Sequence, residues 1–207
     1  MRKRKKYGYI LLASLIISGL AGTPTNNSLT GKERKLASEY LKNTKADVLI
    51  SVKNLSNPQL TYKSGIDKKT IQSCVEDLIY EEKVLWALKE QAMNSIINPE
   101  KRANIKMKDH EVISFFQDLN HPPIFNKEIK KEKKSFSSFE ELLDEYKNLR
   151  TEHIRYIKST SEDLRNHIAY TPLTWLDCYQ ICLIISANNN RLLKLITQIK
   201  ADPNFPK

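Results

Sequence analysis

The chain has 207 residues, of which 40% are hydrophobic and 8% aromatic. This composition supports a packed core and excludes a disordered chain. The five Gly and eight Pro residues exclude collagen-like and low-complexity chains, and three Cys are too few for a disulfide-stapled miniprotein. The net charge is +10, but the stretch Arg2–Lys6 supplies half of it, so the charge does not indicate a nucleic-acid-binding protein.

The first thirty residues have the pattern of an export signal. The basic stretch Arg2–Lys6 precedes an uncharged apolar run over residues 7–20, and Gly19 and Ala21 are small residues of the kind read by a signal peptidase. The run is shorter than the roughly 20 residues of a membrane-spanning helix. We therefore expect an exported protein, periplasmic or extracellular, or alternatively one held at the membrane by this segment. The expected divisions are a signal peptide or anchor (1–21), a linker (22–30) and one domain (31–207).

The rest of the chain has helical periodicity. The pairs Thr30/Glu33 and Ser137/Glu140 have the spacing of a capping box, which marks the start of a helix. Residues 59–69 have the composition of a loop, and the period-2 alternation of strands is missing. We expect an all-α four-helix bundle with a short extra helix between the second and third long helices. The expected long helices span about 31–54, 70–93, 138–159 and 174–201, and the short helix, with Asp109 as its cap, holds the apolar residues of 112–119.

Several separated stretches resemble the DinB-like domain family. Residues 171–177 (TPLTWLD) and 198–206 (QIKADPNFP) look like the end of such a domain, and residues 74–86 resemble its second helix. Residues 98–102 and 158–167 also match this family. The resemblance covers about 31–206 and implies a four-helix bundle, in agreement with the helical periodicity.

The resemblance also implies where a metal would be bound. Members of the family usually hold one divalent metal with three His, one from the second helix and two from the fourth at His-x-x-x-His spacing. The matching positions here are Asp77, Asn188 and Leu192. Leucine has no lone pair to donate, and asparagine offers a neutral oxygen, whereas a catalytic zinc site needs about three protein ligands. We therefore expect no metal and no other cofactor, and no family-type metal-dependent catalysis.

Other polar side chains are candidates for a rebuilt pocket. The four His of the chain do not form a pair at i,i+4 spacing, and we interpret His153 as a half-buried core residue. If Asp77 points inward, as the family position implies, Asn188 could donate a hydrogen bond to it. The expected pocket residues are thus Asp77, Glu82, His153 and Asn188. We interpret Cys74, Cys178 and Cys182 as small core residues.

These observations lead to three hypotheses for function. The first is an exported DinB-like domain that has lost the family metal site and acts as a binding or scaffold module for a small molecule or a protein. The second is a hydrolase or thiol-dependent transferase that uses a rebuilt Asp/Glu/His site around Asp77. The third is a module retained at the membrane surface by residues 7–21 and the lysine-rich stretch 127–134. That stretch lacks interleaved aromatic residues, so we expect no nucleic-acid partner.

Overall fold

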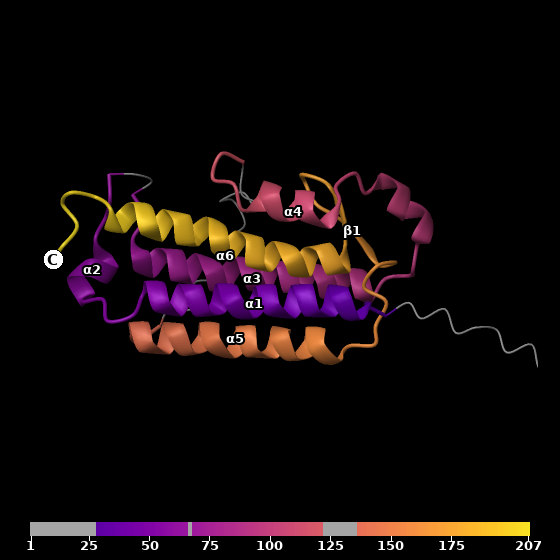
Figure 1. Ribbon diagram of the computed structural model, residues 1–207, viewed down its shortest axis with the longest axis horizontal. Helices are drawn as coiled ribbons and strands as arrows, with labels where there is room; N and C mark the ends of the chain where they lie inside the picture. The colour runs from indigo at the N-terminus through magenta and orange to yellow at the C-terminus, as the bar shows by residue number, and fades with distance from the viewer. Residues whose placement is uncertain (1–27, 66–67, 122–135) are drawn as a thin grey trace, which may run out of the picture.

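The computed structural model describes residues 28–65, 68–121 and 136–207, and it is mostly helical. Four long helices pack along one another (Figure 1). They are α1 (Gly31–Ser51), α3 (Ile71–Met93), α5 (Phe139–Ser159) and α6 (Cys178–Lys200). Helices α1 and α3 each pack against both α5 and α6, so the predicted all-α class is confirmed. Within the described ranges, no helix combines the length and the apolar character needed to cross a bilayer.

Side-chain caps fix where the long helices begin. At the start of α1 the Thr30 hydroxyl accepts from Glu33 N at 3.3 Å, and Glu33 Oε2 accepts from Thr30 N at 2.8 Å, which confirms the predicted capping box. The cap of α5 lies one residue later than predicted, because Ser138 Oγ accepts from Glu141 N at 3.2 Å. Helix α1 ends three residues early, before Asn54, whose φ of 58° is left-handed.

Three short helical elements lie between the long helices in the part of the chain that the structure describes. They are α2 (Asn57–Thr61), the 3₁₀ helix η1 (Pro99–Asn104) and α4 (Asp109–Phe116), of which α4 packs on α6. The predicted extra helix is confirmed as α4, but its N-cap is Lys108 rather than Asp109. Helix α2 occupies the start of the predicted loop 59–69. Pro58 lies in its first turn, where proline is tolerated because its missing N–H has no helical acceptor.

A two-stranded hairpin replaces the predicted start of the last helix. Strands β1 (Ile168–Tyr170) and β2 (Trp175–Asp177) pair antiparallel, with Ala169 opposite Leu176. The expectation of no strands was therefore wrong, and α6 begins at Cys178 rather than near 174. Thr171 closes the turn, since its hydroxyl accepts from Thr174 N at 3.0 Å and its N–H donates to Thr174 O at 2.9 Å. Asp177 then caps α6 by accepting from Gln180 N at 2.7 Å.

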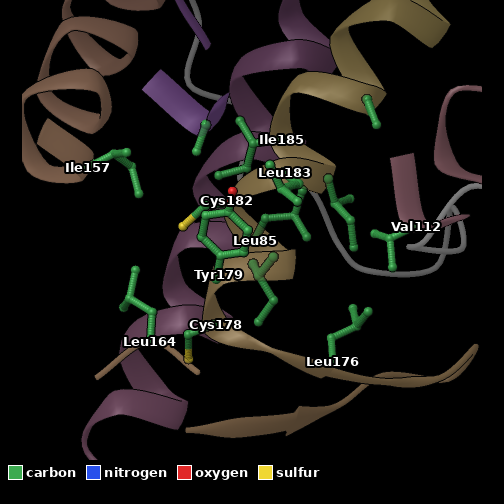
Figure 2. Packing of buried hydrophobic residues seen from close by; sticks show 14 of the residues in the cluster. Leu85, Val112, Ile157, Leu164, Leu176, Cys178, Tyr179, Cys182, Leu183 and Ile185 are labelled. Carbon is green, nitrogen blue, oxygen red and sulfur yellow. The ribbon is translucent and has the colours of Figure 1, made fainter. Parts of the chain in front are cut away.

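Helix α6 runs through the core. Its first half contributes half of the side chains labelled in Figure 2, among them Tyr179 and Ile185, which pack with Leu85 from α3 and Ile157 from α5. Its second half packs with α3 and α5 in a second apolar cluster. The three cysteines of the described chain are buried thiols, as expected for core residues: Cys74, Cys178 and Cys182. Burial raises the pKa of the Cys182 thiol to about 12.

Candidate functional site

The most unusual feature of the interior is a buried group of charged side chains between α3 and α5. Glu82 from α3 is 1% exposed, while Arg150 and His153 from α5 are 0% and 3% exposed. Glu82 Oε1 lies 2.7 Å from His153 Nδ1, and Glu82 Oε2 lies 3.1 Å from Arg150 Nε. Arg150 also donates from Nη2 to Thr44 Oγ1 of α1 at 3.2 Å. A buried carboxylate thus holds one guanidinium and one imidazole, which compensates part of the cost of removing these groups from water.

Aromatic rings cover this group on one side. The Trp86 ring stacks on the His153 ring with centroids 3.6 Å apart, and Tyr156 meets Trp86 edge-on at 5.0 Å. Lys89 Nζ lies 4.2 Å and 4.0 Å from the Trp86 and Tyr156 ring centres, although its side chain is 1% exposed. Cation–π contacts of this kind offset part of the cost of burying an ammonium group. The ammonium group also pairs with Glu90 Oε1 at 2.6 Å.

The predicted pocket is divided between two places. Glu82 and His153 are brought together, but Asp77 and Asn188 each have a partner outside that pair. Asp77 Oδ2 accepts from Lys69 Nζ at 2.9 Å, and Asn188 Nδ2 donates to Glu81 Oε2 at 2.8 Å. The third family position, Leu192, is buried within the second apolar cluster.

These partners decide how well the family positions would suit a metal. The Lys69 ammonium group forms an ion pair with the Asp77 carboxylate. The amide nitrogen of Asn188, rather than its oxygen, faces Glu81. Leu192 adds apolar surface. A divalent cation at these positions would have to displace the Lys69 ammonium and would gain no imidazole, so the residues present do not fit the metal that the family resemblance implies. In the described ranges, no three His, Cys, Asp or Glu side chains group as metal ligands would.

A cleft of about 350 Å³ opens between α1, α4 and α6. Its lining is a mixture of apolar and polar side chains, and Tyr40 and Asn190 are joined within it by a hydrogen bond from Asn190 Nδ2 to the Tyr40 hydroxyl at 3.0 Å. Burial raises the pKa of the Tyr40 hydroxyl. The remaining lining residues are Leu36, Glu39, Asn43, Ile113 and Gln117. A cleft of this size and composition can hold a small polar molecule with an apolar face.

Sequence reasoning missed the buried Arg150 and Lys89. A signal was present, because Arg150 lies on the same apolar stripe of α5 as Tyr146, His153 and Ile157. Lys89 likewise falls on the buried face of α3. A cation at an inward position of an amphipathic helix predicts a buried anion on a neighbouring helix, here Glu82.

A second ion-pair group, also missed, lies where α1 begins. Arg165 donates to Glu33 Oε1 at 2.6 Å, to Asp109 Oδ2 at 2.6 Å and to Asp177 Oδ2 at 2.9 Å. These carboxylates lie at the starts of α1, α4 and α6, and the guanidinium also lies 4.1 Å from the Tyr179 ring centre. Arg165 thus joins three helix ends from distant parts of the chain. Because it already binds three acidic partners, we assign it a structural role.

Some predictions fall on residues that the structure does not describe, namely the signal or anchor segment 1–21, most of the linker 22–30, and the lysine-rich stretch 127–134. Among the expected pocket residues, all lie within the described ranges. The chain matches no protein-family model, no curated protein and no solved structure.

Proposed function

We propose that this chain is an exported DinB-like domain that works as a metal-independent binding module. The observation that carries the proposal is the set of partners at the three family positions. Asp77 is neutralised by Lys69, Asn188 is turned toward Glu81, and Leu192 is buried among apolar side chains. The order of the four long helices and the extra helix before α5 are compatible with the family resemblance.

The cleft between α1, α4 and α6 is the surface that we assign to ligand binding. It combines a Tyr hydroxyl, three side-chain amides and one carboxylate with the apolar side chains of Leu36 and Ile113. Polar groups placed among apolar surface are typical of sites that recognise small molecules. Leu36 is 47% exposed, so a bound molecule would remove substantial apolar surface from water.

Metal analysis tests the loss of the family site. The purified chain should bind zinc, nickel, iron and manganese only as weakly as side chains on a protein surface do, and none of these ions should raise its melting temperature. Stoichiometric tight binding of any of these ions to the native chain would refute the proposal.

A rescue variant tests the alignment itself. The triple variant Asp77→His/Asn188→His/Leu192→His rebuilds the family ligand set and should gain one equivalent of zinc. The matched control replaces the exposed neighbour instead, as Glu76→His/Asn188→His/Leu192→His, and should not. If the two variants behave alike, these positions do not correspond to the family site.

The second candidate function is acid–base catalysis, as in a hydrolase or thiol-dependent transferase. The contact of 2.7 Å between Glu82 and His153 favours it, because a carboxylate and an imidazole at that distance can share a proton. Their exposures of 1% and 3% oppose it, since a substrate must touch the reacting group. A hydrolytic activity abolished by His153→Gln, with the variant still folded by circular dichroism, would favour this candidate over the first.

A further inference from the structure

Exposed apolar side chains are concentrated at the end of the molecule where α1 begins. Four large ones lie in two connections, the 94–98 segment and the hairpin. Ile96 is 94% exposed, Ile97 47%, Tyr170 62% and Leu173 38%. Single exposed apolar residues are ordinary on a protein surface, but a group of them in two neighbouring connections indicates a surface that contacts something apolar.

The hairpin contacts the two elements that flank the 94–98 segment, α3 and η1, which places both connections at one end of the molecule. The Tyr170 and Trp175 rings, paired across the hairpin, have centroids 4.9 Å apart. Lys101 Nζ of η1 lies 5.8 Å from the Trp175 ring centre, and η1 directly follows the 94–98 segment. The start of the hairpin is also tied to the end of α3, because His167 Nδ1 lies 2.9 Å from Ala92 O. We call this surface, made of residues 94–108 and 168–175, the hairpin end.

The hairpin end is basic as well as apolar. Residues 94–108 contain four basic side chains and one acidic side chain, and Lys101 and Lys106 are exposed. Exposed isoleucines, a Tyr–Trp pair and lysines at one end of a molecule are the combination found where proteins meet a lipid bilayer. The apolar groups enter the boundary region, the aromatic rings prefer the headgroup level, and the cations attract acidic lipids.

The position of the start of α1 gives an independent argument. Helix α1 begins at the end where β1 lies (Figure 1), and the same end is fixed by the Arg34 guanidinium, which donates to Ile157 O at 2.6 Å at the end of α5. The seven residues between the uncharged run 7–20 and Ser28 span at most about 29 Å when extended. A run held in a bilayer would therefore keep this end of the molecule near the lipid surface.

We propose that the hairpin end docks on an anionic lipid bilayer, with Ile96, Ile97, Tyr170 and Leu173 entering the boundary region and Lys101 and Lys106 facing the lipid phosphates. This inference deepens the proposed function, because it names the surface that would hold an exported binding module in place. It leaves the cleft between α1, α4 and α6 to the ligand.

Tryptophan fluorescence tests the docking directly, because Trp175 belongs to the hairpin end and Trp86 to the core. The full chain is mixed with vesicles of phosphatidylcholine alone or of an equimolar mixture with phosphatidylglycerol, each containing brominated lipid as a quencher. We expect quenching in the acidic vesicles, which the variant Trp175→Phe should lose. Absence of Trp175 quenching in acidic vesicles overturns the proposal.

Matched charge substitutions identify the surface. The variant Ile96→Asp/Ile97→Asp should reduce the quenching by about half or more, since it removes apolar contact and adds repulsion from acidic lipid. The control Ile50→Asp changes an isoleucine that is 71% exposed at the other end of α1, and its fluorescence should be quenched as strongly as that of the parent. Equal quenching in the two variants overturns the proposal.

The same samples separate the two proposals. Co-sedimentation of the full chain with vesicles reports membrane attachment by any segment, whereas quenching reports contact by the hairpin end. A chain that sediments while Trp175 stays unquenched contradicts the docking surface and leaves the binding module intact. A chain that forms a dimer lost in Ile96→Asp/Ile97→Asp, with no quenching in vesicles, assigns the surface to a second copy and also overturns the docking.

Discussion

Replacing Glu82 by Gln should cost about 3–5 kcal/mol of unfolding free energy. Glu82 Oε2 lies 3.1 Å from Arg150 Nε, and the two side chains are 1% and 0% exposed. The variant keeps the shape of the side chain but removes its negative charge, so the buried Arg150 charge loses the carboxylate that it pairs with and keeps the neutral Thr44 hydroxyl. Removing one member of a fully buried ion pair typically destabilises a protein by this amount, because the remaining charge is neither paired nor solvated. It is a large part of the 5–15 kcal/mol that stabilises a typical domain.

Urea unfolding followed by circular dichroism measures the effect. The double variant Glu82→Gln/Arg150→Met should recover most of the loss, because it removes the orphaned charge and leaves apolar volume in its place. As a control, Lys83→Gln breaks the pair that Lys83 forms with Glu145 at the surface and should change the free energy of unfolding by less than about 1 kcal/mol. A loss below about 1 kcal/mol in Glu82→Gln, or no recovery in the double variant, would refute the reasoning.

Three further predictions concern other parts of the fold. Arg165→Met should lower the unfolding free energy by roughly 1–3 kcal/mol, a value discounted because the side chain is 21% exposed, and an unchanged urea midpoint would contradict it. Burial alone would raise the pKa of Glu33, but hydrogen bonds from Thr30 and Arg165 outweigh it and lower that pKa below 4.5. The stability from Glu33 is therefore present above pH 4.5 and lost as the pH falls below it. The unfolding free energy of Glu33→Gln should thus fall less steeply on acidification than that of the parent, and equal slopes in the two proteins would argue against this. Iodoacetamide should label the buried thiols of Cys74, Cys178 and Cys182 slowly in the native chain and all three after denaturation, because burial limits access and raises the thiol pKa of Cys178 and Cys182. Mass spectrometry counts the labels, and fast labelling of the native chain would contradict the packing.

The long helices could be predicted because their signals are local. The capping box of Thr30 and Glu33 and the apolar spacing on each helix lie within a few residues of one another in sequence. The hairpin could not be predicted in the same way. Its strands have three residues each, too short for an alternation to be recognised, and their pairing depends on a turn closed by the Thr171 side chain. A local signal for the true start of α6 did exist in the capping box of Asp177 and Gln180.

The candidate site was predictable in part. Glu82 and His153 were both named as possible pocket residues, but only His153 was placed on an inward stripe; the structure brings their side chains into contact. The predicted hydrogen bond from Asn188 to Asp77 was wrong, because the Asn188 amide donates to Glu81, one turn beyond Asp77 on the same face of α3. Such choices depend on the rotation and relative height of two helices, which periodicity does not specify. The buried Arg150 was missed because charge suggests a surface position unless the whole stripe is considered.

The partners of α1 have a consequence for the order in which the chain can fold. This first helix packs chiefly against α5 and α6, and its polar contacts join Lys45 to Thr151, Tyr40 to Asn190 and Glu33 to Arg165. Every one of these contacts spans more than a hundred residues of sequence. The apolar stripe of α1 therefore stays uncovered until α5 has been synthesised, and it is fully covered only once α6 follows. Contacts of such long range slow folding, so α1 exposes its apolar stripe for most of the time that the chain takes to be made.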